Sequence, residues 1–312
     1  MTTILHIGLP KTGTTFCQNM LLSLKEQLLD PNQLELSQIP YEDIWGVIRD
    51  DINSQASPGR DIIDTFYHHE RISEKAKSKF STLLYEDLKN RKHSVLFSQE
   101  NFSYLAVSNK YFSDSPSLLF IINEFKKYGP LKIILTIRRQ DEFLESMYMQ
   151  HVRSGSILNF NEYFEKFPTA NLNWLRLIEK LESLIGRENL VIIPYENEVI
   201  RSGGYADIFQ LFLKAIDTRL NVQPTGKLIL VAPSLDPKHV STAIENNKKL
   251  SLQEARDAYI ELSLKFTKMP NQPFDLLTPE QRSKVLFEHQ SGNRDIFKKY
   301  LAAYKGDYYI YF

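Results

Sequence analysis

The chain has 312 residues, of which 42% are hydrophobic and 12% aromatic, so it can bury a large core and extensive disorder is excluded. Lys plus Arg and Asp plus Glu balance at 38 each, which leaves no overall field to attract nucleic acid or an anionic membrane. The single cysteine, Cys17, excludes an internal disulfide and suits a reducing compartment. No secretory signal or stretch of ~18 apolar residues is found, so we expect a cytoplasmic protein without an integral membrane segment.

Several short apolar runs predict β-strands that are buried on both faces. Most are followed by a segment with helical spacing, such as the apolar residues between Trp174 and Ile185. Strands that alternate with helices indicate a mostly parallel sheet with helices on both faces. Such sheets bind ligands at the carboxyl ends of their strands. The predicted strands are Ile4–Gly8, Ser94–Phe97, Ile133–Ile137 and Leu190–Ile193.

The loop at residues 8–15 (Gly-Leu-Pro-Lys-Thr-Gly-Thr-Thr) follows the first strand and opens a helix. Unpaired amide groups and the positive end of the helix dipole point at one spot there, which favours an anion. The spacing of Gly8 and Gly13 matches the start of a nucleotide-triphosphate loop, but Thr14 stands where that loop has its lysine. The lysine is at position 11 instead, inside the loop. A Mg²⁺-dependent kinase or ATPase is therefore disfavoured.

Residues 1–312 are expected to form a single domain. Residues 30–72 carry prolines and mixed polarity without a long periodic element, so we interpret them as an insertion before the second predicted strand. From about residue 238 onward the pattern is helical. Ser251 to Glu254 is typical of a capping box, and Thr278 to Gln281 is a second helix start. We expect this helical region to pack on the sheet or over its active edge.

A second constellation follows the apolar run that ends at Ile137. Arg138 stands at the carboxyl end of that strand, and Ser146 lies eight residues later, about two turns into the next helix. A guanidinium offers a planar fork of donors that matches phosphate oxygens, and a serine hydroxyl adds a neutral donor. Arg139 follows directly, but the spacing to Ser146 favours Arg138 as the phosphate ligand.

The loop at residues 10–15 and the pair Arg138 and Ser146 together resemble the two signatures of the sulfotransferase superfamily, closest to its bacterial carbohydrate-type members. The resemblance implies an α/β fold, a P-loop-like three-layer sandwich with a mostly parallel central sheet and a helical C-terminal region. It implies that Lys11 binds the 5′-phosphosulfate of 3′-phosphoadenosine 5′-phosphosulfate and backs the leaving group, while Arg138 and Ser146 bind its 3′-phosphate. The family usually has Arg-Asn-Pro or Arg-Asp-Pro where this chain has Arg-Arg-Gln. The loop residues implied in cofactor binding are Lys11, Thr12, Gly13, Thr14 and Thr15.

Glu100 follows the second predicted strand, where relatives of the sulfotransferases place their general base. A carboxylate at the open end of a strand can deprotonate an attacking hydroxyl if partial burial raises its pKa toward neutrality. The alternative interpretation is a surface glutamate or a helix N-terminal charge. If Glu100 is not the base, the histidines His68, His69 and His151 are the next candidates.

Two later positions extend the resemblance. Tyr195, after the strand Leu190–Ile193, matches a family tyrosine that lies near the adenine, although an aromatic at a strand end is otherwise ordinary packing. The segment from Ser291 to Arg294 resembles an Asn-Arg helix start of bacterial carbohydrate sulfotransferases. Arg294 is expected either to close over the cofactor or to cap the tail helix.

The implied reaction is in-line transfer of a sulfuryl group to a hydroxyl of a carbohydrate or glycolipid, with adenosine 3′,5′-bisphosphate as product and no metal. The insertion at 30–72 and the tail from about 238 would line the acceptor cleft. His68 and His69 have no further ligand at a recognised spacing, so no metal site is predicted. The aromatic residues do not pair with basic patches, which argues against nucleic acid. The alternatives are an atypical P-loop kinase or NTPase and a non-catalytic module that binds adenosine phosphates.

Overall fold

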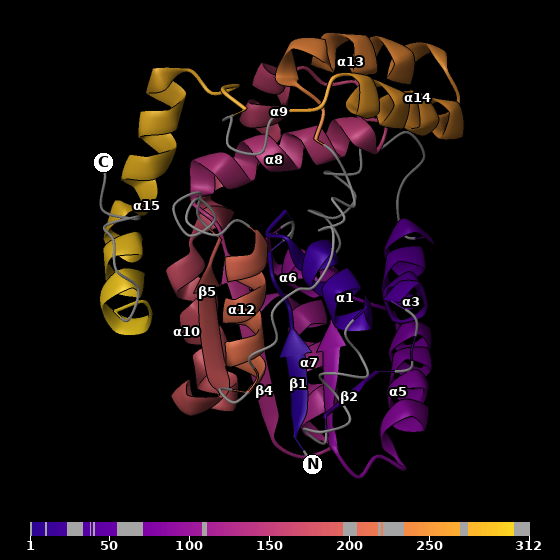
Figure 1. Ribbon diagram of the computed structural model, residues 1–312, viewed down its shortest axis with the longest axis vertical. Helices are drawn as coiled ribbons and strands as arrows, with labels where there is room; N and C mark the ends of the chain where they lie inside the picture. Colours follow the sequence, from indigo (N-terminus) through magenta and orange to yellow (C-terminus); the bar gives the residue numbers. More distant parts are fainter. Residues whose placement is uncertain are drawn as a thin grey trace.

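The architecture is that of a computed structural model. It describes residues 2–9, 11–23, 34–37, 39, 41–54, 71–107, 111–195, 205–217, 220, 234–268 and 274–302. At its centre is a five-stranded sheet in the order β2-β3-β1-β4-β5, with every neighbouring pair parallel (Figure 1). The strands are β1 (Thr3–His6), β2 (Leu34–Leu36), β3 (Ser94–Ser98), β4 (Leu131–Ile137) and β5 (Leu190–Pro194).

The central strands are apolar on both faces because each face is covered by helices. Leu5 and Phe97 point into the larger of two cores, whereas their neighbours Ile4 and Leu96 point into the smaller one. Ile133 and Ile134 divide in the same way on β4. Strand residues alternate in direction, so a continuous apolar run is required to fill both cores.

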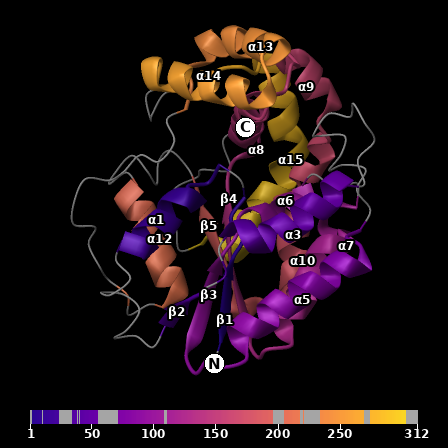
Figure 2. The same cartoon turned by 90° about the vertical axis from the view of Figure 1, so that its right-hand side faces the viewer.

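The two faces are covered unequally, as Figure 2 shows. On the smaller core lie α1 (Thr14–Ser23) and α12 (Tyr205–Ile216). The opposite face carries a larger group of helices. The three-layer α/β arrangement predicted from the sequence is confirmed. The helices of the second group are α3 (Tyr41–Ser54), α5 (Glu74–Leu88), α6 (Asn101–Val107), α7 (Pro116–Lys126), α10 (Trp174–Ile185) and α15 (Pro279–Tyr300).

The expectation that residues 30–72 contain no long regular element is wrong. Edge strand β2 lies in this segment, and α3 packs against α5 with Ile44, Ile48 and Ile52 buried. Each of these isoleucines is four positions from the next, so the three share one helical face. Prolines on both sides and acidic residues between the apolar positions concealed this pattern. Residues 55–70, with His68 and His69, lie outside the described residues.

Helix α8 (Gln140–Arg153) lies across the carboxyl ends of the strands (Figure 1). Above it are α13 (Val240–Lys249) and α14 (Leu252–Lys265), with α9 (Phe160–Lys166) beside them. Reciprocal capping boxes open α14 at Ser251 and α15 at Thr278, which confirms both helix starts predicted from the sequence. Short 3₁₀ turns complete the fold, at η1 (Phe112–Asp114), η2 (Thr169–Leu172), η3 (Arg187–Asn189) and η4 (Pro237–His239).

Within the described residues, no helix combines the length and the apolar character needed to cross a membrane.

Candidate functional site

The loop after β1 turns sharply at the carboxyl edge of the sheet. The amides of Ile7 and Leu9 donate to β4 carbonyls at 3.0 and 2.8 Å, so the chain keeps its course beside β4 as far as Leu9. Lys11 and Gly13 then adopt left-handed backbone conformations, with φ of +66° and +75°. Helix α1 begins at Thr14, so the first-turn amides, which have no partner within the helix, face this loop.

Two glycines are required by close approach within the loop. A Cβ on Gly8 would lie 2.9 Å from the Thr14 hydroxyl and 3.1 Å from the Thr12 hydroxyl. A Cβ on Gly13 would lie 3.0 Å from the ring of Tyr195, in addition to the strain of its positive φ. The hydroxyls of Thr12 and Thr14 therefore border the loop at Gly8, and the ring of Tyr195 borders it at Gly13.

The hydroxyls of the loop differ in their partners. Thr12 Oγ1 donates to the carbonyl of Leu9, whereas the buried Thr14 Oγ1 makes no hydrogen bond of good geometry. Thr15 is exposed. A buried hydroxyl beside the first turn of a helix and close to the Glu100 carboxylate can donate to an anion. The residues present therefore fit a phosphate or phosphosulfate group.

Lys11 and Glu100 form the electrostatic centre of the site. Burial lowers the pKa of Lys11 to about 8, and the Glu100 carboxylate opposes this shift. Burial raises the pKa of Glu100, opposed by the Lys11 ammonium and then by the Thr14 hydroxyl. Both side chains keep some exposure to solvent, so a ligand can reach them. Their mutual effect shows that the loop lysine and the carboxylate after β3 lie close together.

Glu100 is held in place by the backbone around it. The amide of Gln99 donates to the His6 carbonyl at 2.8 Å, and Ser103 Oγ donates to the Gly8 carbonyl at 3.0 Å. These bonds fix the start of α6 to the end of β1 on both sides of Glu100. The carboxylate is therefore positioned by the same strand end that carries the loop.

Arg138 joins the end of β4 to the loop. Its Nη1 donates to the backbone carbonyl of Lys11 at 3.1 Å, and its Nη2 donates to Glu142 at 3.1 Å. The guanidinium also lies over the Tyr195 ring, 5.5 Å from its centroid. Trp174 Nε1 donates to the Arg138 carbonyl at 2.7 Å. The structure thus brings Arg138 and Tyr195 to the loop that contains Lys11.

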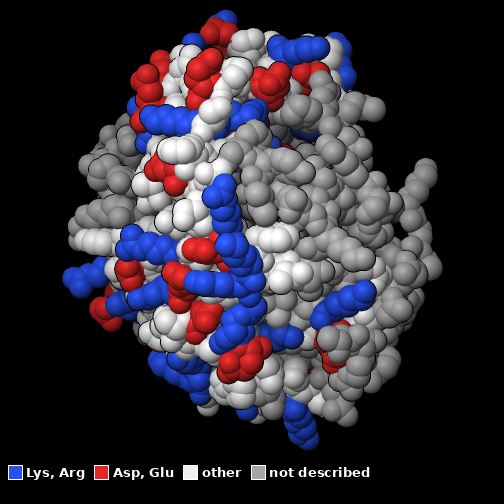
Figure 3. Space-filling view, turned by 90° about the vertical axis from the view of Figure 1, so that its left-hand side faces the viewer, with Lys and Arg blue, Asp and Glu red and all other residues white. Residues whose placement is uncertain are grey.

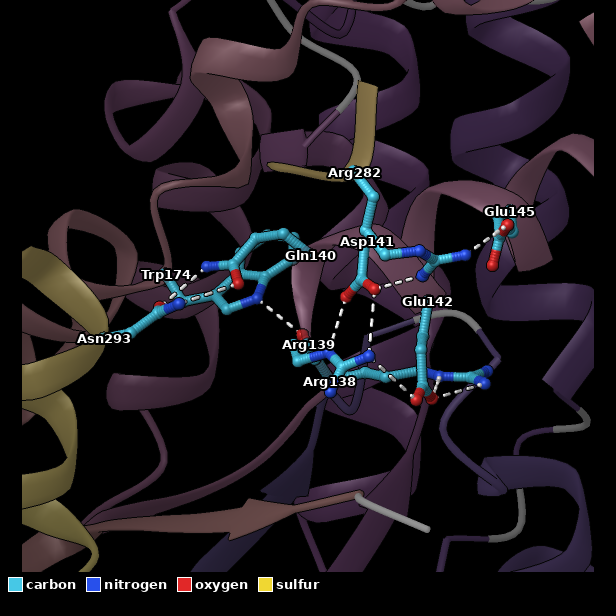
Figure 4. Close-up of polar contacts among 9 residues, drawn as sticks. All are labelled: Arg138, Arg139, Gln140, Asp141, Glu142, Glu145, Trp174, Arg282 and Asn293. Atoms are coloured by element: carbon cyan, nitrogen blue, oxygen red, sulfur yellow. Dashed lines mark hydrogen bonds and ion pairs between the residues drawn. The ribbon is translucent and has the colours of Figure 1, made fainter. Parts of the chain in front are cut away.

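Arg139 shares the Glu142 carboxylate with Arg138, at 3.5 Å, but its shorter contacts belong to a second network, which Figure 4 shows. It forms a two-pronged pair with Asp141 at 2.7 and 2.9 Å, and Arg282 of α15 contacts the same carboxylate. Arg282 also pairs with Glu145 at 3.0 Å, whose Oε1 accepts from the amides of Leu276 and Leu277. Burial raises the pKa of Glu145. This network fastens the C-terminal region to α8.

Asn293 of α15 is bound to the start of α8. Its side-chain amide and that of Gln140 exchange two hydrogen bonds of 2.8 and 3.0 Å (Figure 4). The expectation of a helix start at Ser291–Arg294 is wrong, because these residues lie inside the 22-residue helix α15. Arg294 is exposed there and cannot cap that helix. Its role in cofactor binding stays a prediction.

Ser146 lies on α8, buried with 2% of its surface exposed. No hydrogen bond to its hydroxyl is formed within the described residues. Ser146 follows Glu142 by one turn and therefore shares its helical face, and Glu142 is the partner of Arg138. The Ser146 hydroxyl is thereby on the side of α8 that carries the contact to Arg138.

Three basic or polar residues near the loop were missed from the sequence. Arg153 lies close enough to Lys11 for its charge to lower the Lys11 pKa further. Lys268 has a pKa lowered by burial and then by the charge of Arg138. His6 lies beneath the loop, bonded to Ser98 at 2.8 Å, and burial lowers its pKa to about 3. Arg153 could have been predicted from the sequence, because it shares a helical face with Glu142.

His151 is a poor base in the structure. Burial lowers its pKa to about 4, so it is neutral at pH 7, and its Nε2 is 3.2 Å from the Tyr104 hydroxyl. Among the described residues, no three His, Cys, Asp or Glu side chains are grouped so that they could hold a metal ion.

The face of α10 and α15 mixes the two charge signs, as Figure 3 shows. Lys299 pairs with Glu179, and Asp114 pairs with both Arg176 and Lys180. Such alternation forms no broad basic surface on this face, whereas a nucleic acid footprint requires one.

Comparison with protein families finds no matching family model, and comparison with curated proteins finds no match. Among solved structures, the chain is similar to the crystal structure of a sulfotransferase from Alicyclobacillus acidocaldarius. The identity is 13%, the match covers 84% of this chain and 96% of that chain, and the TM-score is 0.40. A likeness at this level carries no inference about function, which has to be built from the residues of the site.

Proposed function

We propose that this protein is a sulfotransferase that moves a sulfuryl group from 3′-phosphoadenosine 5′-phosphosulfate to a hydroxyl of a carbohydrate or glycolipid. The observation that carries the proposal is the bond between Arg138 and the Lys11 carbonyl. This hydrogen bond joins a guanidinium just after β4 to a loop whose lysine lies beside the carboxylate of Glu100. An adenosine nucleotide that carries phosphates at both its 5′ and its 3′ position needs two cationic groups. Lys11 would serve the 5′ position and Arg138 the 3′ position.

Binding of the donor would divide between the loop and the strand end. The first-turn amides of α1, the Thr14 hydroxyl and Lys11 would hold the 5′-phosphosulfate. Arg138 and Ser146 would hold the 3′-phosphate, with a charge-assisted fork and a neutral hydroxyl. Tyr195, whose ring borders Gly13, would contact the adenine.

The donor supplies an already activated sulfuryl group. Glu100 would accept the proton of the acceptor hydroxyl as the new oxygen–sulfur bond forms. Lys11 would neutralise the charge on the departing phosphate oxygen as the old sulfur–oxygen bond breaks. The raised pKa of Glu100 suits a base that works near neutrality, and Lys11, with a pKa of about 8, is still largely protonated at pH 7. Positioning and charge supply the catalysis.

The acceptor would enter between the loop and the tail helices. Helices α13 and α14 lie above α8, and Asn247 of α13 donates to the Val152 carbonyl at 2.8 Å. We assign the tail from about 238 to the acceptor side of a single domain, in a cytoplasmic protein. The same role for residues 30–72 stays a prediction.

Transfer of labelled sulfate from the donor to a panel of carbohydrates and glycolipids tests the proposal. We expect label in the acceptor and stoichiometric release of adenosine 3′,5′-bisphosphate, both abolished by Lys11→Met. Binding of the bisphosphate with no transfer to any acceptor would favour a non-catalytic adenosine-phosphate module. Phosphoryl transfer from Mg²⁺·ATP would favour the atypical kinase instead.

A further inference from the structure

Arg153, the last residue of α8, differs from the other arginines near the site. Arg138 pairs with Glu142, Arg139 with Asp141, and Arg282 with Asp141 and Glu145. Arg153 forms no ion pair or hydrogen bond within the described part of the chain, although it is partly buried. A partly desolvated guanidinium without an anionic partner is unfavourable and therefore calls for a ligand.

The position of Arg153 follows from the geometry of α8. Glu142, Ser146 and Arg153 fall within about 40° of arc on an α-helix. Glu142 holds Arg138, and Arg138 holds the Lys11 carbonyl, so this face of α8 is tied to the loop. Arg153 is on the same face, and its charge acts on Lys11. The unpaired guanidinium is therefore directed toward the reacting end of the site.

Arg153 is nevertheless separate from the proposed 3′-phosphate subsite. It lies seven residues beyond Ser146, which is about 10 Å along the helix. At that end α8 is bound by the tail. Asn247 donates to the Val152 carbonyl at 2.8 Å, and the Tyr259 hydroxyl donates to the Met149 carbonyl at 3.4 Å. The charge of Arg153 also acts on Tyr259. Arg153 thus lies between the loop lysine and helix α14.

We propose that Arg153 binds a negatively charged group of the acceptor, so that the substrate is an acidic carbohydrate or glycolipid bearing a carboxylate, phosphate or sulfate. This rests on the proposed function, which assigns the donor phosphates to the loop, Lys11, Arg138 and Ser146. Arg153 then remains on the tail side, where the acceptor enters. Its planar fork matches the oxygens of all three anionic groups. A neutral sugar would leave the guanidinium unpaired.

The test compares matched sugars on the protein saturated with adenosine 3′,5′-bisphosphate. The pairs are methyl β-glucuronide with methyl β-glucoside, galactose 6-phosphate with galactose, and N-acetylglucosamine 6-sulfate with N-acetylglucosamine. Calorimetry or ligand-observed NMR at constant ionic strength gives the affinities, and labelled transfer gives the turnover. At least one anionic member should bind about ten- to a hundredfold better than its neutral partner.

Arg153→Met should reduce that preference to within about twofold, and Arg153→Lys should keep part of it, because the charge remains while the fork is lost. The control is Arg256→Met, an exposed arginine on α14 that should leave the preference unchanged. Bisphosphate affinity should stay within a few-fold in all three variants.

The inference is overturned if no pair shows a preference, whether both members bind or neither does. It is also overturned if Arg153→Met weakens donor binding and neutral acceptors as much as anionic ones, since Arg153 would then contact the sulfuryl group itself. Failure of the proposed function has a different signature, which is no binding of the bisphosphate. The Arg153-dependent preference can still be measured on the free protein in that case.

Discussion

Arg138 Nη1 donates a 3.1 Å hydrogen bond to the backbone carbonyl of Lys11, a residue 127 positions earlier in the chain. The carbonyl belongs to a residue in the left-handed conformation, with φ of +66°, which is unfavourable for a side chain other than glycine. Arg138 therefore stabilises the loop shape and places a positive charge beside it. The indole of Trp174 donates to the Arg138 carbonyl at 2.7 Å and thereby holds the backbone of the arginine in place.

Affinity for adenosine 3′,5′-bisphosphate is expected to fall as the pH rises through about 8. Lys11 has a pKa of about 8, so its ammonium loses its charge above that pH and binds the anion less well. Binding should take up a proton near pH 8, which calorimetry in buffers of different ionisation enthalpy measures. Lys11→Arg should flatten the dependence, because arginine stays charged. An affinity that is constant from pH 7 to pH 9.5 would remove Lys11 from the phosphate site.

The same pKa has a consequence for the free protein. The pKa of Lys11 in the folded protein, about 8, is below the ordinary lysine value of 10.5, so unfolding takes up a proton between these values. The contribution of Lys11 to the free energy of unfolding therefore rises with pH from about 8 to 10.5 and is lost as the pH falls through 8. Replacement of Lys11 by Met should raise the melting temperature of the free protein at pH 7. A lower melting temperature would show that the ammonium is stabilised in the free state.

Glu100→Gln should separate binding from chemistry. Glutamine keeps the shape of the side chain but cannot accept a proton, so bisphosphate affinity should stay within a few-fold while kcat falls by roughly 10²–10⁴. Lys11→Met should damage both quantities, because Lys11 contacts the bound donor and the leaving group. The exposed Glu261→Gln is the control. Normal turnover in Glu100→Gln would assign the base to another residue.

The pH profile of turnover gives a second measure of the base. Because burial raises the pKa of Glu100, activity should be lost on the acid side at a higher pH than the ordinary glutamate value. The direction follows from the need for the deprotonated carboxylate. An acid limb at or below that ordinary value would mean that Glu100 does not limit the reaction.

The local features of the site were predictable from the sequence, and the features created by packing were not. The strand, loop and helix around Lys11 are contiguous in the chain, and Arg138 follows directly from the end of an apolar run. Strand β2 has only three residues at the edge of the sheet, too few to show a pattern. Arg282 reaches Asp141 from 141 positions away, and no local signal indicates that pairing.

Arg282→Met is expected to destabilise the fold. Asp141 and Glu145 are 0% and 1% exposed, and Arg282 contacts both carboxylates. Its loss leaves buried negative charge undercompensated, which typically costs about 3–5 kcal/mol. The matched control is Arg176→Met, whose exposed pair with Asp114 should contribute less than about 1 kcal/mol. Equal denaturant midpoints for the two variants would show that the buried network contributes no more to the free energy of unfolding than the exposed pair does.

The two adjacent arginines are expected to differ in their effect on the loop. Arg138 contacts Lys11 and lies over Tyr195, whereas Arg139 is bound to Asp141 in the network of the C-terminal region. Arg139→Met should therefore lower the free energy of unfolding more than it lowers nucleotide affinity. If Arg139→Met weakens nucleotide binding more than Arg138→Met does, the phosphate ligand has been assigned to the wrong arginine.

The most direct test of the proposed site is the affinity ratio between adenosine 3′,5′-bisphosphate and AMP, which differ only in the 3′-phosphate. Calorimetry on the unmodified protein should give a ratio of about ten to a hundred, the value of one or two charge-assisted phosphate contacts. Arg138→Met should bring the ratio close to one, Ser146→Ala should lower it severalfold, and Arg139→Met should preserve it. The ratio cancels any effect of Arg138 on loop shape, because both ligands use the loop. A ratio near one in the unmodified protein, or tighter binding of Mg²⁺·ATP than of the bisphosphate, would contradict the assignment.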